Sequence, residues 1–326
     1  MLIFIVCYFV VSHKHKKEAG IAASLLAGLA LCVIAFFLIT PFRFYVEDAY
    51  HSIFKLIIAD RVLKDDAVIH SNIAYCGTNN PRQTLDLYLP DNDVPPPHGL
   101  VVFVHGGAWR GGDKSTTLLS YYGKYILKSG AAIAALNYRL YPEVTYPKPN
   151  DDVACALSYL QAHAAEYNIS TERWAIFGDS AGAQLAAYAM SDERVNRPLK
   201  LFIGFYGPYN LEIQIDRKPS ADIAAFHYTN DGKDRKTASV LDRPGKQDAT
   251  YLLFHGEKDR IVPISQSENF YKKLKNEGID VVFTRVKNAG HYFSQRSNPT
   301  NKQISDKLLQ ALKNIGTRPL YPSLLH

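Results

Sequence analysis

The chain has 326 residues, 47% of them apolar, a fraction typical of a folded globular protein that excludes a largely disordered chain. Four cysteines are too few for a disulfide-built miniprotein, and no cysteine and histidine spacing fits zinc, so we predict neither a metal nor a cofactor. The 37 lysines and arginines barely exceed the 31 aspartates and glutamates, which gives no clustered basic stripe and excludes nucleic-acid binding.

An uncharged apolar segment runs from Ala19 to Ile39, shortly after the basic stretch His13–Lys17. As a helix it spans roughly 31 Å, which matches a hydrocarbon core of about 30 Å. We therefore predict a short apolar and basic segment over residues 1–18 and a transmembrane helix over 19–39. A cleaved signal peptide and a buried core helix are the alternatives. The lysines before the span predict a cytoplasmic N-terminus, with the large domain outside the cytoplasm and the membrane as its partner.

Residues 40–72 carry apolar positions at helical spacing and predict a helical connector between membrane and domain. Beyond the connector, strand patterns alternate with helix patterns. This alternation predicts an α/β fold with a mostly parallel, doubly wound sheet and helices on both faces. We expect functional residues at the carboxyl ends of its strands. The predicted strands are 84–89, 100–104, 131–136, 174–177, 201–206, 251–254 and 281–286, and the predicted helices are 151–167, 181–190, 265–276 and 302–315.

A G-x-S-x-G sequence, residues 178–182, lies between a predicted strand and a predicted helix. A sharp turn of this kind presents its central serine, Ser180, at the top of the sheet, and the flanking glycines keep neighbouring atoms away from it. The pattern alone is weak, but the helix N-terminus behind it favours negative charge at the same point. Ser180 is therefore a candidate nucleophile.

A second glycine-rich stretch, residues 105–109, leaves the end of a buried strand. Adjacent glycines allow backbone N–H groups to point into one site, so we predict that Gly106, Gly107 and Ala181 donate to an oxyanion. A phosphate-binding loop is the alternative for this stretch. It fails because Asp113 stands where that loop has its lysine, and no dinucleotide-binding fingerprint is present either.

A serine hydroxyl needs a base, and the base needs an acid that orients it. Asp259 follows one predicted strand and His291 follows the next, so both side chains belong to loops at the same edge of the sheet. We predict His291 as the base and Asp259 as the acid, in the chain order Ser, Asp, His. Glu257 is the alternative acid, and His227 and His255 are the alternative bases.

These motifs together resemble those of the α/β-hydrolases of the esterase and lipase group, which include hormone-sensitive-lipase-like carboxylesterases and feruloyl-esterase-like (BD-FAE) enzymes. The resemblance covers residues 73–315 and implies the α/β-hydrolase fold, with Ser180, His291 and Asp259 as a catalytic triad. The chain departs from many relatives at Ala108, where they have a third glycine. The matching stretches are Leu85–Pro90, 105–114, Asn137–Leu140, 178–182 and His255–Asp259.

The resemblance implies a serine hydrolase that cleaves carboxylic esters through an acyl-enzyme. The segment at about 208–248 is short and polar in its middle, so we expect it to be a short cap that suits small or medium esters. It belongs to a single hydrolase domain over residues 73–318, followed by a tail over 319–326. Trp109 and Tyr209 are candidate substrate-binding residues, with packing in the core as the alternative.

Three alternatives stay open at this point. An amide or formamide hydrolase, similar to the kynurenine formamidases, shares the His-Gly-Gly-x-Trp form. The isoprenylcysteine methylesterase-like branch also combines an N-terminal anchor with esterase motifs. A non-catalytic protein with the hydrolase fold is a third interpretation. Cys76 and Cys155 are expected to be unpaired core residues, with a disulfide between them as the alternative.

Overall fold

A computed structural model describes Leu63 and the residues 66–91, 96–115, 117–196, 198–212, 219–295 and 299–313. The predicted transmembrane helix at 19–39 lies outside the described residues, together with the segment 1–18, most of the connector and the tail. Within the described ranges, no helix has both the length and the apolar character that crossing a membrane requires. The membrane helix therefore stays a prediction.

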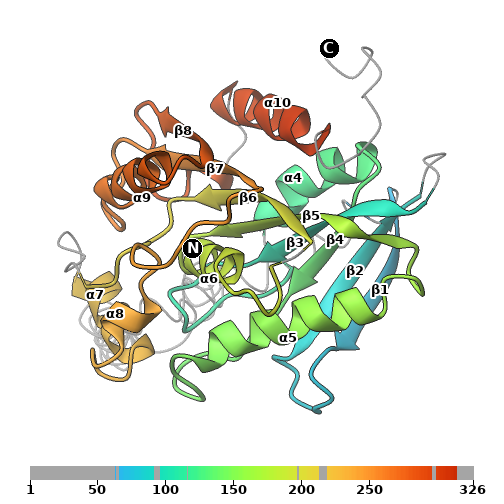
Figure 1. The fold of residues 1–326 in the computed structure, drawn as a ribbon, viewed down its shortest axis with the longest axis horizontal. Helices are drawn as coiled ribbons and strands as arrows, with labels where there is room; N and C mark the ends of the chain where they lie inside the picture. The colour runs from blue at the N-terminus through green and yellow to red at the C-terminus, as the bar shows by residue number, and fades with distance from the viewer. Residues whose placement is uncertain are drawn as a thin grey trace, which may run out of the picture. The chain divides into compact units, whose positions relative to one another are not determined.

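One eight-stranded sheet runs through the described domain, in the order β1-β2-β4-β3-β5-β6-β7-β8 (Figure 1). The pairs β1–β2 and β2–β4 are antiparallel, and the five other pairs are parallel, which confirms the predicted α/β fold with a mostly parallel sheet. The strands are β1 (Ala67–Ala74), β2 (Thr84–Pro90), β3 (His98–Val104), β4 (Ala132–Leu136), β5 (Ile169–Asp179), β6 (Leu199–Phe205), β7 (Thr250–Gly256) and β8 (Asp280–Val286).

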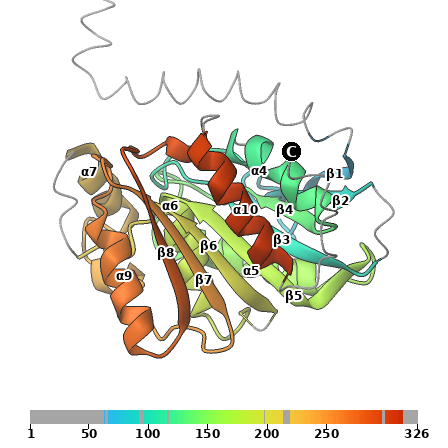
Figure 2. The same ribbon diagram turned by 90° about the horizontal axis from the view of Figure 1, so that it is seen from above.

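Helices cover both faces of this sheet, as predicted (Figure 2). Alternate residues of a strand point to opposite faces, so Val102 in β3 packs in the layer of α5, α6 and α9, while Phe103 packs in the layer of α4 and α10. The short helices α7 and α8 lie between β6 and β7, within the segment predicted as the cap. The helices are α4 (Thr117–Lys128), α5 (Lys148–Ala162), α6 (Ala181–Met190), α7 (Pro219–Tyr228), α8 (Arg235–Ala238), α9 (Ser265–Asn276) and α10 (Pro299–Lys313).

The predicted connector differs from the structure at its C-terminal end. Residues 67–72 were expected to be helical, but they belong to the edge strand β1, which pairs antiparallel with β2. Most of the β1 side chains are exposed or half-buried, so the strand lacks the apolar alternation by which strands are recognised in a sequence. Its backbone pairing with β2, rather than its side-chain pattern, defines it.

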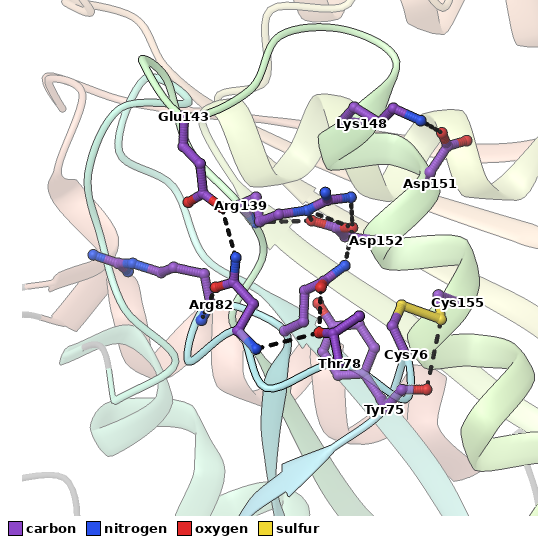
Figure 3. Close-up of polar contacts among 12 residues, drawn as sticks. Tyr75, Cys76, Thr78, Arg82, Arg139, Glu143, Lys148, Asp151, Asp152 and Cys155 are labelled. Atoms are coloured by element: carbon purple, nitrogen blue, oxygen red, sulfur yellow. Dashed lines mark hydrogen bonds and ion pairs between the residues drawn. A yellow bond between two sulfur atoms is a disulfide. The ribbon is translucent and has the colours of Figure 1, made fainter.

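A disulfide joins Cys76, in the turn after β1, to Cys155 on α5, with Cα atoms 5.8 Å apart (Figure 3). This corrects the expectation that the two cysteines are unpaired. Neither residue is fully buried, so the apolar environment on which that expectation rested is incomplete. The bond ties the turn between the first two strands to the helical layer.

Two ion pairs hold the loops around the carboxyl end of the sheet. Lys114 Nζ lies 2.7 Å from Asp86 Oδ1, and both side chains are buried. The Arg139 guanidinium donates to both carboxylate oxygens of Asp152, which also accepts a hydrogen bond from Gln83 (Figure 3). The charged residues of the matching stretches thus join β2, the loop after β3 and the loop after β4.

Candidate active site

Ser180 lies at the sharp turn between β5 and α6, with φ 50° and ψ −123°. A non-glycine residue with positive φ is strained, and such strain concentrates at functional sites. The flanking glycines are required by close packing, because a Cβ atom at Gly178 would lie 2.4 Å from the Gly182 carbonyl oxygen. A Cβ atom at Gly182 would lie 2.1 Å from the carbonyl oxygen of Val104. The serine is therefore presented at the carboxyl ends of the strands, as the sequence predicts.

The structure brings together Ser180, His291 and Asp259, which follow β5, β8 and β7. Ser180 Oγ lies 3.0 Å from His291 Nε2, and His291 Nδ1 lies 2.7 Å from Asp259 Oδ2. A carboxylate only accepts, so the Nδ1–H group donates to Asp259 and Nε2 is left to accept the serine proton. The three side chains form one continuous line of hydrogen bonds.

The carboxylate of Asp259 is surrounded by hydrogen-bond donors. Its Oδ1 atom accepts from the backbone N–H groups of Ile261 and Val262, at 2.8 and 3.0 Å. Burial by itself raises the pKa of the Asp259 carboxyl, but hydrogen bonds from His255 and His291 outweigh this effect and hold the pKa well below its usual range. Asp259 is therefore ionised at neutral pH.

The alternative acid and bases lie elsewhere. Glu257 is exposed, and its carboxylate accepts from the backbone of Asn288. His227, on α7, pairs with Asp231 at the surface. His255 is fully buried, and its Nε2 atom lies 3.2 Å from Asp259 Oδ2. None of the three side chains is in hydrogen-bond contact with Ser180 among the described residues.

The glycine-rich stretch after β3 lies against the N-terminus of α6, but it uses its N–H groups differently from the prediction. The N–H group of Gly106 donates to Asp179 Oδ1 at 2.8 Å, so it is not free to bind a substrate oxygen, which corrects the prediction for this residue. The N–H groups of Gly107, Ala108 and Ala181 donate to no group of the described chain. These three N–H groups are the donors that remain free to bind a substrate oxygen beside Ser180.

The two predicted substrate-binding side chains are packed in the core. Trp109 is 2% exposed, donates through Nε1 to Gln184 and stacks on Tyr228 with ring centroids 4.5 Å apart. Tyr209 has no exposed surface and stacks on Phe270. Both side chains therefore pack in the core, which was the alternative to substrate binding.

Two polar contacts to the loops that carry the site are not predictable from the sequence. Asp179 precedes the nucleophile and binds the glycine-rich stretch, and His255 precedes the acid loop and contacts its carboxylate. A buried polar side chain at a strand end has no distinct sequence pattern. Asp179 and His255 could therefore be noticed only because they lie near residues that were predicted.

Among the described residues, no group of histidine, cysteine, aspartate and glutamate side chains is arranged to hold a metal ion.

The chain is similar in sequence to a family of esterases and to individual curated esterases. The BD-FAE family model matches residues 85–274, more than half of the chain. A probable isoprenylcysteine alpha-carbonyl methylesterase of Oryza sativa subsp. japonica is 26% identical over 77% of this chain and 60% of its own length. An acetyl esterase of Salmonella schwarzengrund is 26% identical over 55% of this chain and 56% of its own.

Solved structures share the fold at low sequence identity. Esterase LipW from Mycobacterium marinum has a TM-score of 0.71 and 19% identity, over 85% of this chain and 91% of that chain. An inhibited esterase B from Lactobacillus rhamnosis has a TM-score of 0.70 and 19% identity, over 84% and 96% of the two chains. The chain spans 46–64% of the length of the first four curated relatives that it matches.

Proposed function

The chain belongs to the BD-FAE family of α/β-hydrolase esterases and lipases, and on this premise we propose that it is a serine hydrolase that cleaves carboxylic esters. The observation that carries the proposal is the line of hydrogen bonds from Ser180 through His291 to Asp259. An uncharged serine hydroxyl becomes a nucleophile only when a base takes its proton, and this geometry provides that base with its orienting acid.

The proposed reaction has two acyl-transfer steps. Ser180 Oγ attacks the carbonyl carbon of the ester while His291 Nε2 takes the hydroxyl proton, and Asp259 stabilises the imidazolium that forms. The tetrahedral intermediate collapses, the carbon–oxygen bond to the alcohol breaks, and His291 returns the proton to the departing oxygen. Water then attacks the acyl-enzyme with His291 as base, which releases the acid and restores Ser180.

We assign the negative oxygen of the intermediate to the N–H groups of Gly107, Ala108 and Ala181. This set differs from the predicted one by a single residue, because Gly106 already donates to Asp179. The N-terminus of α6 adds its dipole at the same point, because Ala181 is its first residue. Removing one such donor costs about 3 kcal/mol in the barrier of a comparable reaction.

We propose esters of small to medium size as substrates. The names of two relatives, an acetyl esterase and a methylesterase, support a small acyl or alcohol group. The short cap, with the helices α7 and α8, also supports this size. The His-Gly-Gly-Ala-Trp sequence favours formamide hydrolysis as a second candidate function. Comparing kcat/KM for p-nitrophenyl esters of increasing acyl length with that for N-formylkynurenine separates the two.

We also propose that residues 19–39 anchor the enzyme in a membrane, with the catalytic domain outside the cytoplasm. The uncharged length of this segment supports the anchor, and the Cys76–Cys155 disulfide supports an oxidising compartment. The full chain should sediment with membranes after a carbonate wash, and its domain should be cleaved by protease added from outside the cytoplasm. Domain cleavage only after lysis would contradict this topology.

The esterase proposal is tested by Ser180→Ala. Activity on p-nitrophenyl acetate should fall by several orders of magnitude while the circular-dichroism spectrum and the melting temperature are retained. As a matched control, Ser115→Ala removes a hydroxyl that bonds Asp113 in the loop after β3, and it should retain activity. Undiminished turnover by Ser180→Ala would refute the proposed nucleophile.

A further inference from the structure

A second histidine contacts the carboxylate of Asp259. His255 lies near the carboxyl end of β7 and has no exposed surface. Its Nε2 atom is 3.2 Å from Asp259 Oδ2, the same oxygen that His291 Nδ1 approaches to 2.7 Å. We infer that His255 is a positioning residue for Asp259 and sets the pH range over which the site works. The inference rests on the proposed esterase mechanism.

The neighbours of His255 decide which of its nitrogen atoms donates. Nε2 lies 3.0 Å from the Val262 carbonyl oxygen, which can only accept, so Nε2 carries a hydrogen. Nδ1 lies 2.8 Å from Ser267 Oγ, a hydroxyl that can donate to a neutral ring or accept from a charged one. In either protonation state the Nε2–H group therefore donates to Val262, and its positive hydrogen also lies beside Asp259 Oδ2, 3.2 Å from Nε2.

This donor completes the surroundings of Asp259. Two backbone N–H groups hold Oδ1, and two imidazole rings meet at Oδ2. The four contacts fix the rotation of the carboxylate, so Oδ2 is aimed at His291 before substrate arrives. They also divide the negative charge of Oδ2 between two donors, which weakens its stabilisation of the imidazolium form of His291.

Few other described side chains contact His291. The described side chains that contact it are Asp259, Ser180 and the rings of Tyr206 and Tyr292. Burial raises the pKa of Tyr206 well above its usual value, so that ring is uncharged at neutral pH.

One charged residue lies next to His255 in the sheet, and its charge is directed elsewhere. Arg285, its neighbour across β7 and β8, directs its guanidinium to Glu268 on α9. The effect of His255 on His291 therefore passes through Asp259.

Two variants of His255 separate positioning from packing. In His255→Gln the side-chain amide reaches the position of Nε2 and keeps a donor for Asp259. In His255→Asn the shorter amide reaches the position of Nδ1, so the contact with Ser267 is kept and the donor to Asp259 is lost. Both replacement side chains are polar and uncharged, which makes them a matched pair for the buried position.

We expect His255→Asn to lower kcat by roughly tenfold or more with little change in KM, the effect of one lost hydrogen bond to a charged group. The acidic limb of its profile of kcat/KM against pH should move to higher pH, because an Asp259 with one donor fewer favours the imidazolium of His291 more strongly. His255→Gln should retain the wild-type limb and more of the activity. His163→Asn, at the end of α5, is the control and should leave both quantities unchanged.

The values of kcat and kcat/KM are normalised to the fraction of Ser180 that a fluorophosphonate labels. Partial unfolding therefore does not imitate a change in kcat. Equal losses in His255→Asn and His255→Gln with unmoved acidic limbs would overturn the inference, as would full activity of His255→Asn. A wild-type chain that neither hydrolyses esters nor labels would contradict the proposed function instead.

A measurement on the wild-type chain covers the case in which His255→Asn does not fold. Nitrogen-15 chemical shifts of the imidazole rings report which nitrogen carries a hydrogen. The inference expects His255 to carry one on Nε2 at neutral pH. A ring protonated on Nδ1 alone would overturn it, because such a ring has no donor to offer Asp259.

Discussion

Replacing Asp259 by asparagine tests the orientation of the proposed triad, because the structure decides how the new amide must lie. The backbone N–H groups of Ile261 and Val262 both donate to Oδ1, so the oxygen of the introduced amide has to occupy that position. The amide NH2 group then takes the place of Oδ2 and points at His291 Nδ1. Two donors cannot face each other, so the imidazole has to carry its hydrogen on Nε2 instead.

A proton on Nε2 prevents His291 from accepting the hydroxyl proton of Ser180. In a comparable triad this loss lowers kcat by about 10⁴-fold, which corresponds to about 5 kcal/mol in the activation barrier. We expect the same order of loss for Asp259→Asn on p-nitrophenyl acetate at neutral pH, with a folded protein by circular dichroism. Asp248→Asn, which changes an exposed acid paired with lysines, is the control and should keep its activity. Retention of kcat within tenfold in Asp259→Asn would refute the reasoning.

Three further predictions concern stability. Lys114→Met leaves the buried carboxylate of Asp86 without its ion-pair partner and should lower the free energy of unfolding by about 3–5 kcal/mol in urea titrations, and no loss would contradict the buried pair. Cys155→Ser opens a loop of 79 residues and should lower the free energy of unfolding by about 4–5 kcal/mol, while dithiothreitol should destabilise the wild type and not the variant. Burial lowers the pKa of His105 from 6.5 to about 4, against a smaller opposite effect of its hydrogen bond to Gly106, so the unfolded chain binds a proton more readily than the folded one. Stability should therefore fall as pH drops from about 6.5 towards 4, by about 2 kcal/mol at pH 5, and His105→Asn should reduce that dependence.

Much of the site could be predicted because its residues follow strands in a parallel sheet. Ser180, Asp259 and His291 are each the chemically distinctive residue in a loop after a predicted strand. Strand ends of one parallel sheet meet at the same edge, so separation along the chain does not prevent their convergence. The glycines around Ser180 were readable for a similar reason, since only glycine fits where two backbones approach this closely.

The structure differs from the sequence-based predictions where residues far away in the sequence determine the contacts of a side chain or backbone group. Gly106 and Gly107 are adjacent and identical in type, but the carboxylate of Asp179, at the end of β5, accepts from the N–H group of Gly106 and not from that of Gly107. Trp109 and Tyr209 are aromatic residues beside the site whose burial depends on partners in α6, α7 and α9. The disulfide between Cys76 and Cys155 likewise depends on how α5 lies against the turn after β1.

The edge strand β1 and the helix α4 were missed for a different reason. Most of β1 is exposed or half-buried, so its side chains carry little pattern. The helix α4 directs Tyr122, Ile126 and Leu127 into the layer that it shares with α10. In both cases the neighbouring elements define the structure more than the local sequence does.

The most direct test of the account is to trap the covalent intermediate. The wild-type chain is mixed with p-nitrophenyl acetate, quenched with acid within milliseconds, digested and analysed by mass spectrometry. We predict an acetyl group on the peptide that contains Ser180, formed at the rate of the p-nitrophenol burst and absent from Ser180→Ala. Turnover without any acylated serine, or an acetyl group on another residue that forms at the burst rate, would contradict it.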